Sequence, residues 1–192
     1  MKQTPASPES DFEYRIIVDE DSKTESCVIT KYIGTSETVV IPDMINSVPV
    51  VSIAGEAFAF NSNLSSVTIP DSVTKIECGR YLDDIWWQPG AFDRCKNLSA
   101  VVLSSNLMHI GDYTFYDCAS LTTITIPDKV VYIGDYAFSG CASLTTVTIP
   151  ENVDKIGYCA FSDCGLLSKR VDKKIKKDKK KILGQCKCPE GD

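Results

Sequence analysis

The segments LTTITIP at 121–127 and LTTVTIP at 144–150 are nearly identical and start 23 residues apart. Two earlier segments match them less closely, LSSVTIP at 64–70 and LSAVVLS at 98–104. Self-similarity at a fixed period of this size is the sequence signature of a repeat architecture. Within LTTITIP, the leucine and the two isoleucines are spaced to point inward while the threonines point outward. The chain is therefore predicted to be an array of stacked repeats.

Three further residue types recur in the same register. The phenylalanines are Phe58, Phe92, Phe115, Phe138 and Phe161, and three residues after them stand Asn61, Cys95, Cys118, Cys141 and Cys164. The isoleucines that precede them are Ile53, Ile76, Ile110, Ile133 and Ile156. Each proline ends a strand because it has no N–H for a sheet, and each AF-x-x-C is predicted to form a helical turn that inserts its ring. One unit cannot bury its apolar face alone, so stacking must supply the core.

The pattern L-T-T-[IV]-T-I-P…V-x-x-I-G-x-x-A-F-x-x-C-x-x-L resembles the BspA-like (treponemal-type) leucine-rich-repeat family over roughly residues 37–165. Residues 12–42 look like the β-hairpin with which that family usually begins. The resemblance implies an α/β repeat fold, a right-handed leucine-rich-repeat solenoid of about five units. We expect a β-hairpin N-terminal cap and short helical turns on the convex side. The resemblance also implies a cell-surface or secreted binding role, often adhesion to host proteins.

Charge divides the chain unequally. Residues 1–167 carry 10 Lys and Arg against 22 Asp and Glu, whereas residues 168–192 carry 10 against 4. An acidic body argues against a nucleic-acid groove along the main domain. The predicted organisation is a flexible N-terminus at 1–11, the hairpin cap at 12–42, the leucine-rich-repeat solenoid at 43–167 with an insertion at 77–90, and a lysine-rich C-terminal helix or tail at 168–192.

The basic C-terminus has apolar residues at the spacing of one helix face, namely Leu167, Val171, Ile175 and Ile182. Solenoids need their last repeat covered, so a terminal cap helix with a solvated lysine face is one interpretation. A basic amphipathic helix over 168–183 that binds an anionic membrane or nucleic acid is a second. A disordered tail is a third.

Four of the nine cysteines lie on the repeat ladder, at Cys95, Cys118, Cys141 and Cys164. Their position inside the stack predicts buried, reduced thiols that behave as small hydrophobes. Cys186 and Cys188 form a lone C-x-C, without the second pair of ligands that zinc needs. We therefore predict no metal site.

His109 is the sole histidine, in a slot that other repeats fill with Ser52, Lys75, Tyr132 and Lys155. That slot is variable and mostly polar, so His109 is predicted to be a solvated surface residue. No carboxylate pair, glycine-rich phosphate loop or nucleophile elbow occurs in an activating context. The sequence therefore predicts neither an enzyme nor a bound cofactor.

The outward positions of the four strands form one candidate surface. Ten of these twelve positions are Ser or Thr, none is charged or aromatic, and the partner-binding candidates among them are Thr123, Thr125, Thr146 and Thr148. Threonine favours strands, so a simple well-built β surface is one interpretation. A smooth concave face that accommodates a ligand is the other.

The insertion at 77–90 forms a second candidate surface. Ile76 and Phe92 are 16 residues apart, against 5 for Ile110 and Phe115, and the extra residues lie within ECGRYLDDIWWQPG. Insertions in repeats become surface loops, and Trp, Tyr and Arg are enriched in binding hot spots. The tryptophans either cover the convex side or bind a partner. The partner-binding candidates are Arg80, Tyr81, Asp83, Asp84, Trp86 and Trp87.

Together these features predict a monomeric, non-catalytic protein-binding module with no small-molecule substrate. The leading hypothesis is a cell-surface or secreted adhesion or host-interaction protein. The first alternative is an intracellular binder or inhibitor of one specific protein, because MKQTPASPESDFEY lacks the apolar region of a secretory signal. The second is attachment to an anionic membrane or nucleic acid through the basic tail.

Overall fold

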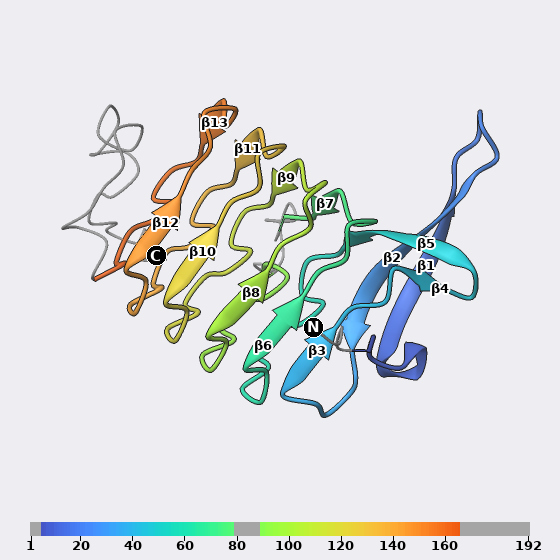
Figure 1. Ribbon diagram of the computed structural model, residues 1–192, viewed down its shortest axis with the longest axis horizontal. Helices are drawn as coiled ribbons and strands as arrows, with labels where there is room; N and C mark the ends of the chain where they lie inside the picture. The colour runs from blue at the N-terminus through green and yellow to red at the C-terminus, as the bar shows by residue number, and fades with distance from the viewer. Residues whose placement is uncertain (1–4, 79–88, 166–192) are drawn as a thin grey trace, which may run out of the picture.

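The computed structural model describes residues 5–78 and 89–165 of the chain. Its repeats follow one another along the long axis, with short parallel strands of successive repeats side by side (Figure 1). The predicted C-terminal helix or tail at 168–192 lies outside the described residues, as does most of the insertion. Within the described ranges, no helix is long and apolar enough to cross a membrane.

The strands form three sheets. The long sheet runs in the order β1 (Phe12–Val18), β2 (Glu25–Tyr32), β5 (Val48–Ile53), β7 (Lys75–Ile76), β9 (His109–Ile110), β11 (Tyr132–Ile133) and β13 (Lys155–Ile156), and β4 (Met44–Ile45) pairs with β5. A three-stranded sheet contains β3 (Thr38–Val40), β6 (Ser66–Thr68) and β8 (Ala100–Val102). A two-stranded sheet contains β10 (Thr123–Thr125) and β12 (Thr146–Thr148). Within the two short sheets all pairing is parallel, as the repeat predicts.

The core is built on a continuous stack of phenylalanine rings. Consecutive centroids in the series Phe58, Phe92, Phe115, Phe138 and Phe161 lie 4.8, 5.2, 5.3 and 5.0 Å apart, with interplanar angles of 18° or less. All five side chains are fully buried. Burying each ring contributes about 1.5–3 kcal/mol. The predicted phenylalanine register is confirmed.

An antiparallel pair of strands lies at one end of the stack. β1 and β2 pair antiparallel, and β2 then pairs parallel with β5. Tyr32 stacks on Phe58 at 5.3 Å, and Phe12 packs against Tyr32 at 5.4 Å. The hairpin thereby extends the ring stack by two aromatic side chains.

The described part of the N-terminal segment differs from the predicted flexible arm. The Ser7 N–H donates to the Val40 carbonyl at 2.8 Å, and the Val40 N–H donates to Ser7 Oγ at 3.1 Å. Residues Glu9–Asp11 then form the 3-10 helix η1, the one helix within the described ranges. This reciprocal pair of hydrogen bonds holds the segment against the edge of β3, which the composition of the segment did not predict.

The AF-x-x-C segments are hydrogen-bonded turns rather than helical turns, and together they form what we call the turn side. The Cys95 N–H reaches the Phe92 carbonyl at 3.2 Å within one turn. The Phe92 N–H donates to the Thr114 carbonyl of the next repeat at 2.8 Å, and the Arg94 N–H to the Tyr116 carbonyl at 2.7 Å. Because alternate N–H groups bond to the next repeat, a helix cannot propagate within the segment. Arg94 accordingly has a left-handed φ of 53°.

Candidate binding surface

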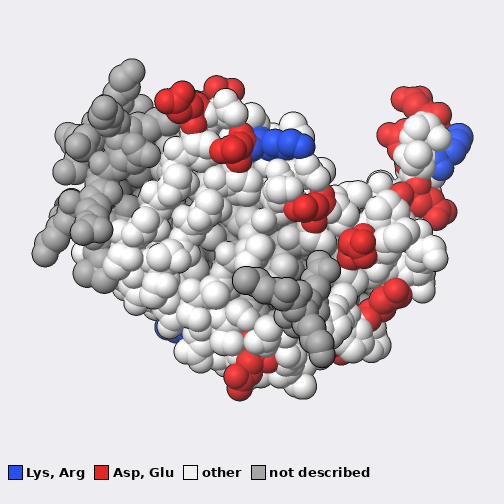
Figure 2. Space-filling model, in the orientation of Figure 1, with Lys and Arg blue, Asp and Glu red and all other residues white. Residues whose placement is uncertain are grey.

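The outward side chains of β3, β6, β8, β10 and β12 form a surface that we call the strand face. Thr123 pairs in register with Thr146, and Thr125 with Thr148, and all four side chains are exposed. In the view of Figure 2 the surface over these strands is largely uncharged, and Asp and Glu side chains lie around it. The four threonine candidates therefore share one accessible surface.

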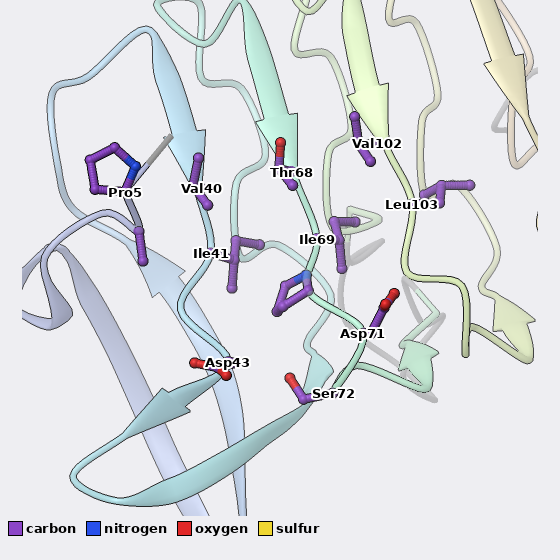
Figure 3. Close-up of a pocket in the computed structure, with 12 residues that line it drawn as sticks. Pro5, Val40, Ile41, Asp43, Thr68, Ile69, Asp71, Ser72, Val102 and Leu103 are labelled. Carbon is purple, nitrogen blue, oxygen red and sulfur yellow. The ribbon is translucent and has the colours of Figure 1, made fainter. Parts of the chain in front are cut away.

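A groove of about 690 Å³ opens at the ends of β3, β6 and β8, beside the N-terminal segment. Val40, Thr68 and Val102 occupy equivalent positions on these strands and line it, together with Leu103 (Figure 3). Val102 is 58% exposed, which is unusual for a large aliphatic side chain. The groove thus offers apolar contacts within an otherwise hydroxyl-rich face.

The groove lies beside a break in the strand pairing. β6 pairs with β8, and β10 pairs with β12, but no strand pairing links β8 to β10 within the described residues. The segment 98–104, LSAVVLS, departs most from the repeat at this point. Its Val101 is only partly buried, whereas the equivalent Val67 and Ile124 are fully buried. The least regular strand of the array therefore borders the break.

Two carboxylates stand at the rim of the groove, Asp43 and Asp71. Asp71 Oδ1 accepts a hydrogen bond from the Ser105 backbone N–H at 2.7 Å. This bond lowers the pKa of Asp71 below its usual value. Asp71 is therefore charged at neutral pH and favours a cationic group at the rim.

The insertion leaves and rejoins the stack beside the preceding repeat. The Pro89 carbonyl accepts the Glu56 N–H at 3.1 Å, and a Cβ on Gly55 would lie 2.9 Å from the Cys78 carbonyl oxygen. Only a residue without a side chain fits at this close approach. The predicted candidates between these two ends lie outside the described residues: Arg80, Tyr81, Asp83, Asp84, Trp86 and Trp87.

An aromatic and cationic cluster on the turn side spans this repeat and the repeats on either side of it. The Arg94 guanidinium lies 5.5 Å from the Phe60 ring centroid and 5.4 Å from that of Tyr116. Tyr113 stacks on Tyr136 at 5.0 Å further along this side. These are the residue types that dominate protein interfaces, and the sequence analysis did not single them out. Reading the positions beside each phenylalanine across repeats would have revealed them.

The ladder cysteines are free, buried thiols, as predicted. Each also donates a hydrogen bond to the phenylalanine carbonyl of the preceding repeat, with Sγ–O distances of 3.0 Å for Cys95 and 3.2 Å for Cys164. Burial raises the pKa of both thiols to about 12. Each thiol thus satisfies a backbone carbonyl as well as filling the core. Cys159, by contrast, is disulfide-bonded.

His109 lies on β9 with a partly exposed side chain, in agreement with the predicted surface slot. Its ring centroid is 6.4 Å from that of Tyr132 on the neighbouring strand. Within the described ranges, no group of three or more His, Cys, Asp or Glu side chains is placed to hold a metal ion. Cys186 and Cys188 lie outside the described residues.

The sequence profile of the BspA type leucine rich repeat region matches six copies over residues 35–81 and 88–188. The chain belongs to the BspA-type leucine-rich-repeat family. Six copies exceed the five units expected from the phenylalanine series. No curated protein matches the chain significantly.

Solved structures of other leucine-rich-repeat proteins resemble this BspA-type protein. The leucine-rich repeat protein of T. pallidum is 33% identical with a TM-score of 0.74, over 85% of this chain and 69% of that one. A leucine-rich repeat protein of Bacteroides capillosus is 31% identical with a TM-score of 0.53, over 70% and 91%. A leucine rich cell surface protein of Faecalibacterium prausnitzii is 28% identical with a TM-score of 0.52, over 86% and 54%. Leucine-rich-repeat proteins generally bind other proteins.

Proposed function

We propose that this BspA-type repeat protein is a non-catalytic module that binds another protein through its strand face, with the groove as the anchoring point. The observation that carries the proposal is the exposed, in-register, uncharged strand face that ends in a groove lined by Val102 and Leu103. Binding interfaces combine a desolvated apolar centre with a polar surround. Apolar valines at the centre and threonine hydroxyls around them supply that combination.

The chemistry of the groove defines the partner segment that it fits. Val40, Val102 and Leu103 favour an apolar side chain, and Asp43 and Asp71 favour a neighbouring lysine or arginine. Residues 1–167 also carry twelve more acidic than basic side chains. Complementary charge speeds and orients encounter more than it adds affinity. The proposed partner is therefore a protein with an exposed segment that places an aliphatic residue beside a cationic one.

We further propose that the binding serves adhesion at a cell surface or in a secreted form. The support is the likeness to the leucine rich cell surface protein of Faecalibacterium prausnitzii. We also propose that the repeats form a right-handed solenoid, with β1 and β2 as its N-terminal cap. The stacking of Tyr32 on Phe58, which covers the first ring of the ladder, supports the cap.

The insertion is the second element of the proposed interface. Arg94 lies on the turn side of the repeat that carries it, and its guanidinium lies over the rings of Phe60 and Tyr116 in the repeats on either side. A partner that contacts both the strand face and the insertion would span two sides of the repeat stack. Trp86 and Trp87 would then supply the aromatic anchors that the strand face lacks.

The test compares Val102→Asp with Val18→Asp. Both valines are exposed, at 58% and 51%, but Val18 lies on β1, away from the groove. Saturation binding to extracellular matrix deposited by cultured epithelial cells is measured for the wild type and both variants. We expect V102D to lose about tenfold or more in affinity, because burying a new carboxylate beside Asp71 costs well over 1 kcal/mol. V18D should bind like the wild type.

Salt supplies an independent measurement. Raising ionic strength from about 0.05 to 0.5 M should slow association with the matrix, since screening shortens the reach of Asp43 and Asp71. Wild-type affinity in V102D would contradict the groove as the anchor. Absence of saturable binding by the wild-type chain would contradict the adhesion proposal itself.

A further inference from the structure

β3 is an edge strand of the three-stranded sheet, because within the described residues it pairs only with β6. The Glu37 carbonyl accepts a hydrogen bond from the first residue of β6 at 3.1 Å, and the Ile41 N–H donates to the Thr68 carbonyl of β6 at 3.0 Å. Since backbone groups alternate between the two sides of a strand, Thr38 and Val40 direct their N–H and carbonyl groups outward. An outward row of this kind is a template for a further strand.

Serine hydroxyls satisfy most of these outward groups. Ser36 Oγ donates to the Thr38 carbonyl at 2.7 Å and accepts a hydrogen bond from the Thr38 N–H at 3.2 Å. Ser7 Oγ accepts a hydrogen bond from the Val40 N–H at 3.1 Å, and the Ser7 N–H donates to the Val40 carbonyl at 2.8 Å. Within the described residues, the Val40 carbonyl is therefore the one outward group of β3 that bonds to another backbone group. Side-chain hydroxyls stand where the backbone of a neighbouring strand would otherwise bond.

Residues 5–7 occupy this edge without forming a strand. In an extended segment alternate residues face the same side, so the next residue to face β3 would be Pro5 or Glu9. Pro5 has no N–H to donate, and Glu9 begins the 3-10 helix η1. Pro5 lies beside Val40 and lines the groove with it (Figure 3). The segment thus holds the edge through Ser7, and a regular strand would form more backbone hydrogen bonds there.

We propose that the edge of β3 is a strand-addition site, where an extended segment of the protein partner displaces residues 5–7 and pairs with Thr38 and Val40. The inference rests on the proposed function, because Val40 also lines the groove that anchors the partner. An added strand lies about 4.8 Å from β3 and directs alternate side chains to the groove side. In strand addition the backbone supplies affinity and the alternate side chains supply specificity. The partner segment is therefore extended, and its residues that face β3 are not proline.

Residues 5–7 compete with the partner for the same backbone groups. The measured affinity is reduced by the fraction of molecules in which the edge is free. Ser7→Pro removes both the N–H donor and the hydroxyl acceptor, whereas Ser7→Ala removes only the hydroxyl. We expect S7P to bind about threefold tighter than the wild type or more, and S7A to lie between them. Ser10→Ala, at an exposed serine of η1, is the control and should bind like the wild type.

A defined peptide tests whether the backbone is recognised. The probe is a fluorescein-labelled, end-blocked hexapeptide of alternating valine and lysine, which supplies the aliphatic and cationic side chains that suit the groove and Asp71. Two isomers carry N-methyl groups on the valine amides or on the lysine amides, so each isomer lacks the N–H groups of one side. Fluorescence anisotropy measures binding to the wild type and to S7P. Since one side of the peptide faces β3, we expect one isomer to lose about tenfold or more in affinity and the other less than about twofold.

Equal affinities of the two isomers, or no binding of the unmethylated peptide to S7P, would overturn strand addition. Binding by S7P that is no tighter than that of the wild type would do the same, because residues 5–7 would then not compete with the peptide. The matrix assay separates this failure from that of the proposed function. If V102D loses matrix binding while the two isomers bind equally, the groove still anchors the partner, but through side chains alone.

Discussion

The repeats contribute parallel strands both to the long sheet and to the strand face, and only the long sheet is continuous. In the long sheet, β5, β7, β9, β11 and β13 pair without interruption. On the strand face the pairing stops between β8 and β10. The long-sheet strands repeat a polar residue followed by isoleucine, whereas 98–104 has Val102, Leu103 and Ser104 where the three other segments all have Thr-Ile-Pro. The local sequence therefore decides where strand pairing is continuous, and it does so separately for the long sheet and for the strand face.

The break does not interrupt the core. Across the same junction Phe92 stacks on Phe115 at 5.2 Å with an interplanar angle of 6°. On the turn side, the Arg94 N–H still donates to the Tyr116 carbonyl at 2.7 Å. Ring stacking and turn hydrogen bonds thus set the spacing of the repeats, and the strand face is free to vary. Such freedom is what a binding surface requires.

The largest expected effect lies in the regular region, at Phe138. Phe138→Ala should lower the free energy of unfolding by about 3–5 kcal/mol, because the neighbouring rings cannot collapse into the cavity. Met108→Ala, at a side chain that is 45% exposed, serves as the control and should cost well below 1 kcal/mol. Denaturant titration measures both. A loss below 1 kcal/mol for F138A would mean that the ring stack does not set the repeat spacing.

The next effect concerns binding at the irregular insertion. Adjacent side chains of an extended segment point to opposite sides, so Trp86 and Trp87 should differ in role. We expect one Trp→Ala variant to lower the melting temperature and the other to weaken matrix binding by about 2 kcal/mol with little loss of stability. Thermal melts and saturation binding of the two single variants separate these roles. If both bind normally, the insertion only covers the fold.

A third prediction concerns the buried carboxyl of the irregular repeat, Asp93. Its side chain is fully buried, both carboxyl oxygens lack a hydrogen-bond partner, and its contact with Arg94 Nη1 is long, at 3.7 Å. Burial raises its pKa to about 7, against an opposing effect of Arg94 and a reinforcing one of Asp117. Asp93 is therefore protonated in the folded chain up to about pH 7. Because the unfolded chain loses this proton already near pH 4, the free energy of unfolding falls as the pH rises from about 4 to 7.

Asp93→Asn removes that ionisation while keeping the shape of the side chain. We expect the variant to match the wild type near pH 4 and to be more stable by about 2 kcal/mol at pH 8. Chemical denaturation at several pH values measures the difference. Asp163→Asn changes an exposed carboxyl at a comparable turn and should show no such trend. A constant difference across this pH range would mean that Asp93 is not protonated in the fold.

Periodicity was sufficient to predict the repeat, the phenylalanine stack and the ladder thiols, because a period of 23 leaves one register for Phe115, Phe138 and their cysteines. It could not predict the groove, which forms where the ends of three neighbouring strands meet Pro5 and Ala6 of the N-terminal segment. It also missed the hydrogen bonds between Ser7 and Val40, because nothing in a short polar segment specifies a distant backbone partner. The departure of 98–104 from the consensus was the one visible signal of the groove.

The smallest expected effect comes from restoring one consensus residue beside the break, with Ser104→Pro. The Leu107 N–H donates to the Ser104 carbonyl at 3.1 Å, as the Val73 N–H does to the Pro70 carbonyl at 3.0 Å. The turn already has the proline geometry, so a proline there should restrict mainly the unfolded chain and stabilise the fold by about 0.5 kcal/mol. The loss of the hydrogen bond from the Asn106 N–H to Ser104 Oγ, 3.1 Å long, opposes part of this gain.

This variant also separates two causes of the break. If the missing proline opens the junction, S104P should re-form the pairing of β8 with β10 and weaken groove-dependent matrix binding. We expect binding to stay unchanged instead, because Val101, three residues earlier, is already only partly buried at the junction. Denaturant titration and the matrix assay on the same preparation decide between the two. A destabilisation above 1 kcal/mol would show that the turn at Ser104 is not equivalent to that at Pro70.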